Sequence, residues 1–188
     1  MIKKTNQNIE TAAELSLMPD DGNRYELVQG TLKIMSPAGS EHGEVADRIG
    51  RRLGDFVETH NLGKTFAAET GFRIENDPDT VRAPDAAFVS HDRLASVEST
   101  HVYLPLAPDL VVEVVSPNDS FSDVEAKAEQ WMNAGTKIVL IADPANRTLG
   151  VYESVSHMRV LHSGEIFESG NVCGRWQLSV DDAFQIEK

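Results

Sequence analysis

The alternation of hydrophobic and polar residues predicts that much of the chain forms β-strands. Residues 25–35 hold two short apolar segments on either side of Gln29-Gly30, a pattern typical of a β-hairpin. The segment APDLVVEVVSP, residues 107–117, is apolar on both alternating faces and predicts a strand that is buried on both sides. The other predicted strands lie at about residues 64–75, 81–90 and 137–143, followed by a hairpin around PANR (144–147) and short strands within 157–167 and 175–180.

Helical periodicity separates these strands at two places. A first helix is expected to begin near Ser40, a possible N-cap, and to end near Gly63. A second helix is expected over residues 121–134, with Ser120 or Ser122 as its N-cap. The order of a hairpin, a helix, three strands, a helix, a strand and trailing β-hairpins predicts an α/β or α+β fold with a central mixed sheet covered on both faces.

Two carboxylates interrupt the apolar strands. Glu113 is surrounded in residues 110–115 by valine and leucine, and an ionised carboxylate buried there without a partner would cost roughly several kcal/mol. Glu113 is therefore expected to be paired, bound to a metal or placed at a strand end that opens into a cleft. Asp85 follows Pro84, which disfavours a central position in a β-ladder. If the two strands are neighbours, the acids converge and repel unless a cation lies between them, and Mg²⁺ or Mn²⁺ is the natural choice.

Two further polar residues fall within helical apolar stripes. Lys127 lies three residues after Val124 and four before Trp131, which mark the stripe of the second helix. Its ammonium could extend to solvent along the methylene stem, or it could point into the cleft with the two acids, held by Asp123 one turn earlier. His42 falls near the centre of the stripe of the first helix, where a packing role and a chemical role are both open.

Composition narrows the class of protein. The chain has 188 residues, of which 40% are hydrophobic, as expected for one globular domain over residues 1–188. Its one cysteine, Cys173, excludes an internal disulfide framework and suits a reducing cytoplasm. The N-terminus lacks the apolar run of a signal peptide and no stretch is apolar enough to span a bilayer, so a soluble, cytoplasmic protein is expected.

The charge is strongly acidic. Lysine and arginine total 17 and aspartate and glutamate 30, which gives a net charge of −13. This charge repels polyanions at long range, but it does not exclude a nucleic-acid enzyme, because acidic metal ligands add to the count when their ion is ignored. Arg48, Arg51 and Arg52, with Lys64 following, are a local basic exception. The three arginines are either a solvated helix face or candidates for contact with backbone phosphates.

The acid after a proline, the acid on the next strand and the nearby lysine resemble the PD-(D/E)xK restriction-endonuclease-like superfamily. Pro84-Asp85 matches the first part of the motif and Glu113 the second. Within the superfamily the chain closely resembles the bacterial Uma-two-type family of predicted endonucleases, over roughly residues 25–184. The stretches that carry this resemblance are YELVQGTLKIMSPAGSEHGEV, RAPDAAFV, PDLVVEVVSPND, DVEAKAEQWMNAGTKIVLIADPANRTLGVY and WQLSVDDAF. The resemblance implies a restriction-endonuclease-like core with additional β-hairpins at both ends.

The chain departs from the general motif at Val115, where the superfamily has a lysine two residues after the second acid. Members of the family share this departure, and the resemblance implies that Lys127 on the following helix replaces the strand lysine and that His42 belongs to the site. It further implies Mg²⁺- or Mn²⁺-dependent hydrolysis of DNA phosphodiester bonds. Asp85 and Glu113 would hold the metal in this reaction.

Two other functions stay open. One is a catalytically silent binding or assembly module that keeps the nuclease fold, which the net charge and the missing strand lysine favour. The other is a metal-dependent hydrolase of a different phosphate ester. If the chain cleaves both strands of duplex DNA, two active sites are needed, so a homodimer is expected. The front hairpin and the C-terminal strands have edges that a second subunit could cover.

Overall fold

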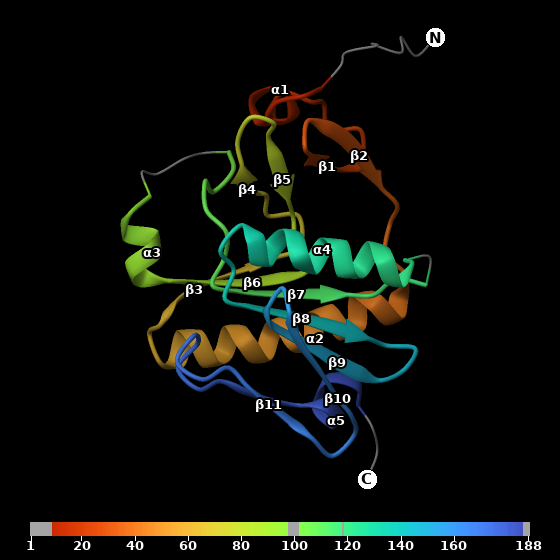
Figure 1. Cartoon of the computed structure of the whole chain (residues 1–188), viewed down its shortest axis with the longest axis vertical. Coiled ribbons are helices and arrows are strands. Elements are labelled where there is room, and N and C mark those ends of the chain that lie inside the picture. The colour runs from red at the N-terminus through yellow and green to blue at the C-terminus, as the bar shows by residue number, and fades with distance from the viewer. Residues whose placement is uncertain (1–8, 98–101, 118, 186–188) are drawn as a thin grey trace.

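A six-stranded mixed sheet forms the centre of the molecule (Figure 1). The computed structural model describes residues 9–97, 102–117 and 119–185. The strand order of the central sheet is β10-β9-β8-β7-β6-β3, and all neighbours in it are antiparallel except β7 and β8. Its strands are β3 (Gly63–Ala67), β6 (Ala86–Ser90), β7 (Leu110–Val114), β8 (Ile138–Asp143), β9 (Thr148–Ser154) and β10 (His157–Leu161).

A smaller antiparallel sheet of four strands lies beside one face of the central sheet, in the order β2-β1-β5-β4 (Figure 1). Its strands are β1 (Arg24–Val28), β2 (Thr31–Met35), β4 (Phe72–Glu75) and β5 (Thr80–Arg82), and a separate pair consists of β11 (Ile166–Glu168) and β12 (Gln177–Ser179). The helices are α1 (Ala12–Ser16), α2 (Ser40–Thr59), α3 (His91–Ala95), α4 (Phe121–Asn133) and α5 (Val180–Phe184). β1 and β2 form the predicted hairpin, with Val28 opposite Thr31 across Gln29-Gly30.

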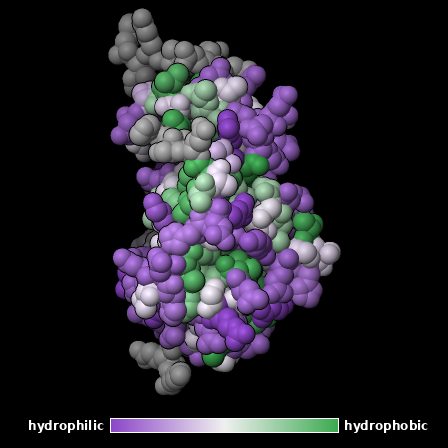
Figure 2. Space-filling model, turned by 90° about the vertical axis from the view of Figure 1, so that its left-hand side faces the viewer, coloured by the Kyte–Doolittle hydropathy of each residue, from purple (hydrophilic) through white to green (hydrophobic). Residues whose placement is uncertain are grey.

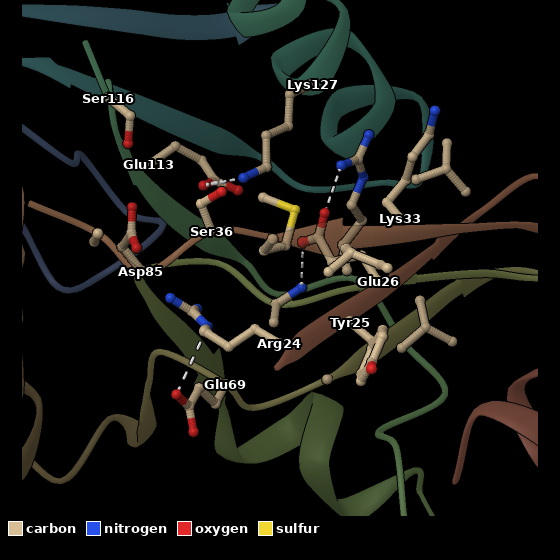
Figure 3. Close-up of a pocket in the computed structure, with 18 of the residues that line it drawn as sticks. Arg24, Tyr25, Glu26, Lys33, Ser36, Glu69, Asp85, Glu113, Ser116 and Lys127 are labelled. Atoms are coloured by element: carbon tan, nitrogen blue, oxygen red, sulfur yellow. Dashed lines mark hydrogen bonds and ion pairs between the residues drawn. The ribbon is translucent and has the colours of Figure 1, made fainter. Parts of the chain in front are cut away.

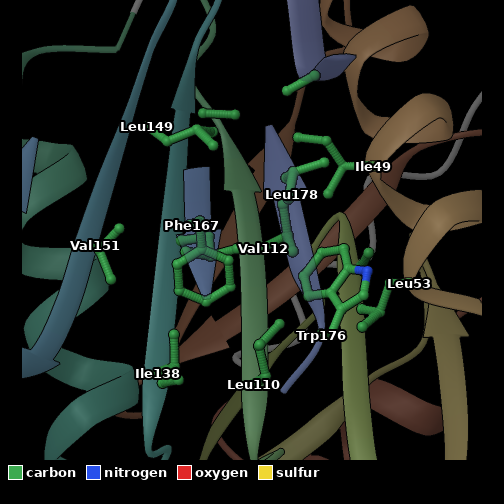
Figure 4. Packing of buried hydrophobic residues seen from close by; sticks show 14 of the residues in the cluster. Ile49, Leu53, Leu110, Val112, Ile138, Leu149, Val151, Phe167, Trp176 and Leu178 are labelled. Carbon is green, nitrogen blue, oxygen red and sulfur yellow. The ribbon is translucent and has the colours of Figure 1, made fainter. Parts of the chain in front are cut away.

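The central sheet is covered on both faces, as the sequence predicts. On one face, Ile49 and Leu53 of α2 pack with sheet residues and with residues of the C-terminal region, namely Phe167 of β11, Leu178 of β12 and Trp176 just before β12 (Figure 4). On the other face, α4 contributes Ala128 and Trp131 to a second buried cluster, which also contains Phe72, Ala87, Val89, Val111, Val139, Ile141 and Tyr152. Glu113 of β7 is buried, and its carboxylate lies on the face covered by α4.

Three predicted boundaries are wrong. Residues 64–75 are β3 and β4, which lie in different sheets, because the chain turns at residues 68–71, where Glu69 has a φ of 75°. Residues 81–90 are likewise β5 and β6, separated at Pro84, which has no N–H for a ladder. The first helix ends at Thr59 rather than near Gly63, and Gly63 instead begins β3, where a Cβ would collide with the backbone of Val89.

The helix caps are partly as predicted. α2 begins after Gly39 without a side-chain cap, so Ser40 is the first helical residue and not the N-cap. α4 is capped by Ser120, which accepts a hydrogen bond from the N–H of Asp123. Among the described residues, no helix has both the length and the apolar character needed to cross a bilayer. Hydrophilic residues cover most of the face in Figure 2, and the hydrophobic ones form separate patches.

Candidate active site

Asp85 and Glu113 lie close together at one end of the central sheet (Figure 3). β6 and β7 are antiparallel neighbours with Ala86 opposite Val112, so the register places Asp85 opposite Glu113. The Asp85 carboxylate also accepts a hydrogen bond from the backbone N–H of Val114 at 2.8 Å. This bond attaches the segment before β6 to the end of β7. The two strands are therefore neighbours, and their two acids lie close together, as the sequence predicts.

Glu113 is 5% exposed, and both of its carboxylate oxygens have partners. Lys127 Nζ lies 2.6 Å from Oε2, and the indole N–H of Trp131 donates to Oε1 at 2.8 Å. Both donors come from α4, because Glu113 shares the α4-facing side of β7 with Val111 and Val115. A helix of the same chain thus supplies the partners that burial of this carboxylate requires.

Lys127 points into the pocket and not along the protein surface (Figure 3). The sequence left both positions open, and the structure selects the one beside Glu113. Asp123, which sequence reasoning offered as a partner for Lys127, has a different role. Its carboxylate accepts hydrogen bonds from the N–H and hydroxyl of Ser120 and so closes the capping box of α4.

His42 lies in the first turn of α2 and is 9% exposed. Its Nε2 is 3.3 Å from Oδ2 of Asp85. Its Nδ1 is buried and has no hydrogen-bond partner in the described part of the chain. The histidine therefore joins the site through Asp85.

The ionised groups of His42, Asp85, Glu113 and Lys127 change one another's pKa values. Burial raises the pKa of Glu113 to about 7, although the Lys127 ammonium acts in the opposite direction. Burial also disfavours the ammonium of Lys127, but Glu113 and Glu26 outweigh it and raise the pKa of Lys127 above its ordinary value. Burial opposes the ionisation of Asp85, yet the hydrogen bond and charge of His42 hold the pKa of Asp85 below its ordinary value. The hydrogen bond with Asp85 raises the pKa of His42 in turn.

These four residues line a pocket of about 690 Å³. Its opposite wall is the hairpin of β1 and β2, which contributes Arg24 and Lys33. Arg24 lies 3.6 Å from Glu69, and Lys33 is exposed opposite Glu26 in the hairpin register. The pocket is therefore bounded by α4 on one side and by a sheet face with two cationic residues on another.

The arginines of α2 do not contribute to this pocket. Arg48 is 5% exposed, donates to the carbonyl of Ala183 at 3.0 Å and pairs with Glu44. It is a buried structural residue and not a candidate for contact with phosphate. Arg51 is exposed, pairs with Asp47 at 2.9 Å and is not among the residues that line the pocket.

Sequence reasoning missed Glu26, which lines the same pocket and is 3% exposed. Glu26 pairs with Arg82 at 2.7 Å, and Arg82 Nε donates to Gln130 of α4 at 2.8 Å. The sequence gives little sign of this network, because Arg24, Glu26 and Lys33 read as the solvated face of a hairpin. Only the packing of α4 and β5 near that face buries Glu26.

The donor set suits a hard divalent cation better than zinc. In residues 9–97, 102–117 and 119–185, no group of three or more His, Cys, Asp or Glu side chains is arranged to hold a metal ion. Structural zinc sites take about four protein ligands, whereas Mg²⁺ is commonly bound by one or two carboxylates and keeps several waters. The carboxylates of Asp85 and Glu113 fit the second arrangement.

Comparison with known proteins identifies the family. A family model named Uma2, described as "Putative restriction endonuclease", matches residues 12–181. The chain belongs to the Uma2 family. Asp85, Glu113, Lys127 and His42 all lie within the matched residues, and no curated protein matches significantly.

A solved structure has the same fold. It is described as "a putative nuclease belonging to DUF820 from Anabaena variabilis ATCC 29413" and aligns with a TM-score of 0.80 at 19% sequence identity. The alignment covers 93% of this chain and 97% of that chain. The restriction-endonuclease-like family and the α/β fold predicted from the sequence are thus confirmed.

Proposed function

We propose that this Uma2-family chain is a Mg²⁺- or Mn²⁺-dependent endonuclease that hydrolyses DNA phosphodiester bonds. The observation that carries the proposal is the convergence of two strand carboxylates, Asp85 and Glu113, with the ammonium of Lys127 in one pocket. Membership of a family described as "Putative restriction endonuclease" supports a nuclease, and the fold shared with the Anabaena protein, described as "a putative nuclease", agrees with it.

Asp85 and Glu113 are the residues that would hold the metal ion. When bound, a divalent cation polarises the scissile phosphate and lowers the pKa of a bound water. The site keeps Asp85 ionised, because His42 and the Val114 N–H both stabilise its carboxylate. Glu113 is held in place by donors on both oxygens, and each oxygen retains a lone pair for a metal ion.

Lys127 and His42 are proposed to act beside the carboxylates. The Lys127 ammonium stabilises negative charge on the phosphate as the transition state forms, a role for which a compact point charge is suited. It also orients the attacking water. His42 fixes the orientation of Asp85 through Nε2.

Two measurements test the proposal. Isothermal titration with Mn²⁺ should show a saturable site in the wild type that is lost in Asp85→Ala and Glu113→Ala. Cleavage of plasmid and single-stranded DNA with Mg²⁺ or Mn²⁺ should be abolished by Glu113→Gln and by Lys127→Ala, and Lys127→Ala should keep most of the Mn²⁺ affinity.

The matched control is Lys64→Ala, which changes an exposed lysine on β3 outside the pocket and should retain activity. A wild type without a saturable Mn²⁺ site would refute the nuclease and favour a binding module.

We also propose a homodimer as the form that cleaves duplex DNA, since two strands require two active sites. β2 and β10 each lie at the end of a described sheet and carry exposed apolar residues, among them Ile34 and Met158. Such edges are surfaces that a second copy could cover. Sedimentation equilibrium at micromolar concentration should give twice the mass of the chain, and a monomer that still cuts both strands would contradict the proposal.

A further inference from the structure

The ion pair of the buried Glu26 and the half-buried Arg82 lies in the wall of the pocket and has no role in the reaction proposed above. Glu26 is 3% exposed, and its Oε2 lies 2.7 Å from Nη1 of Arg82. A buried ion pair is seldom a net source of stability, because removing two charges from water costs about as much as their attraction returns. We therefore ask whether the ion pair holds neighbouring parts of the site in a fixed position.

One bond of Glu26 leads to the segment that carries Asp85. Its second oxygen, Oε1, accepts the backbone N–H of Ala83 at 3.0 Å. Pro84 follows Ala83 and restricts the backbone on both sides of itself, and Asp85 comes next. Fixing the N–H of Ala83 therefore limits where the Asp85 carboxylate can lie.

The other bond leads to the helix that carries Lys127. Arg82 uses Nη1 for Glu26 and Nε for the side-chain oxygen of Gln130, at 2.8 Å. Gln130 is three residues after Lys127, so the two side chains lie on the same face of α4. Arg82 thus fixes the rotation of α4 at the turn from which Lys127 reaches Glu113.

We propose that Glu26, Arg82 and Gln130 form a positioning network that holds Asp85 and Lys127 in register with Glu113. The inference rests on the proposed nuclease function. Its first test, below, measures the rate of DNA cleavage, whereas its second test measures only metal binding. These residues act through Asp85 and Lys127 and contact neither the metal nor the DNA. Losses of activity on removing such supporting contacts are typically about 10- to 100-fold.

The first test separates the hydrogen bond of Gln130 from its packing. Gln130→Leu keeps the bulk but lacks the acceptor for Arg82, whereas Gln130→Glu keeps an acceptor oxygen. Gln130→Leu should lower kcat for plasmid cleavage about 10- to 100-fold with little change in KM, while Gln130→Glu stays within about threefold of wild type. The Mn²⁺ dissociation constant should be unchanged in both. Glu125→Ala, exposed on the same helix, is the control and should match wild type. Equal kcat values for the two Gln130 variants would overturn the proposal.

The second test needs no cleavage activity. Glu26→Leu removes the acceptor for Ala83, whereas Glu26→Gln keeps an oxygen that can accept the same N–H. Glu26→Leu should weaken Mn²⁺ binding about tenfold in calorimetry and Glu26→Gln much less, because only the first releases the Asp85 segment. If circular dichroism shows that Glu26→Leu does not fold, Glu26→Asp, one methylene shorter, replaces it in the comparison. Equal Mn²⁺ affinities would overturn the network even if the wild type cleaves DNA. Wild type that binds Mn²⁺ without cleaving would instead refute the nuclease and leave this comparison valid.

Discussion

Replacing Glu113 by glutamine should make the metal-free protein more stable at pH 8 while removing its activity. Burial raises the pKa of Glu113 from its ordinary value of 4.5 to about 7, so the folded chain binds this proton more tightly than the unfolded chain does. The stability that comes from the protonated form is fully present below pH 4.5 and is lost as the pH rises through about 7. At about 1.4 kcal/mol for each tenfold change in proton affinity, the ionised carboxylate costs about 3 kcal/mol at pH 8. Glutamine resembles the protonated side chain and avoids this cost.

The assay is urea unfolding of wild type and Glu113→Gln between pH 4.5 and 8, with EDTA present. The variant should be more stable by about 3 kcal/mol at pH 8, and the difference should shrink toward zero near pH 4.5. Glu58→Gln, an exposed glutamate of α2, is the control and should show no comparable pH-dependent difference. In a second series without EDTA, Mn²⁺ should stabilise only the wild type, by about 2.7 kcal/mol at 100 times the dissociation constant. A Glu113→Gln variant that is less stable than wild type at pH 8 without metal would refute the reasoning. In that case the ion pair of Glu113 with Lys127 in the wild type would stabilise the fold by more than the burial of the carboxylate costs.

Two further predictions concern the hydrogen bond of Trp131 to Glu113 and the cationic residues of the pocket wall. Trp131→Phe removes the indole N–H that donates to Glu113 at 2.8 Å, and urea unfolding should show a loss of about 1.5–3 kcal/mol, the contribution of a hydrogen bond to a buried charge. An unchanged stability would mean that this bond is replaced by water. Neutralising Arg24 and Lys33 together should weaken DNA binding and reduce the salt dependence of affinity by up to about two phosphate contacts, whereas Arg51→Gln should do neither in the same fluorescence anisotropy titration.

Much of the fold could be predicted because hydrophobic periodicity records which faces are buried. Residues 109–116 and 137–143 are apolar on both faces, and they form β7 and β8, the parallel pair at the centre of the sheet. The division of residues 64–75 into two sheets could not be predicted, because β3 and β4 have similar patterns, and Phe66 of β3 and Phe72 of β4 pack in the same hydrophobic cluster although they belong to different sheets. Hydrophobic periodicity indicates which side of a strand is buried, but it does not indicate which other strand lies next to it.

The same limit explains which residues of the candidate site could be predicted from the sequence. Glu113, Asp85 and Lys127 were found because each is polar where its pattern requires an apolar residue. Glu26 was missed because it is polar in a strand whose alternate face looked solvated, and its burial comes from β5 and α4, which are distant in sequence. A buried polar residue can be recognised from sequence only when its neighbours in the sequence are themselves buried.

The proposed use of Lys127 in place of a lysine on the strand changes which parts of the structure must be held rigid. A lysine at position 115 would share a strand face with Glu113, and the geometry of β7 alone would fix their separation. In this chain the separation depends on how α4 docks on the sheet. Trp131, which is fully buried and bonded to Glu113, fixes that docking from one side. Gln130, bonded to Arg82, would fix it from the other. Changes in these two contacts should therefore affect catalysis as strongly as changes in a strand register would in a nuclease whose lysine lies on the strand.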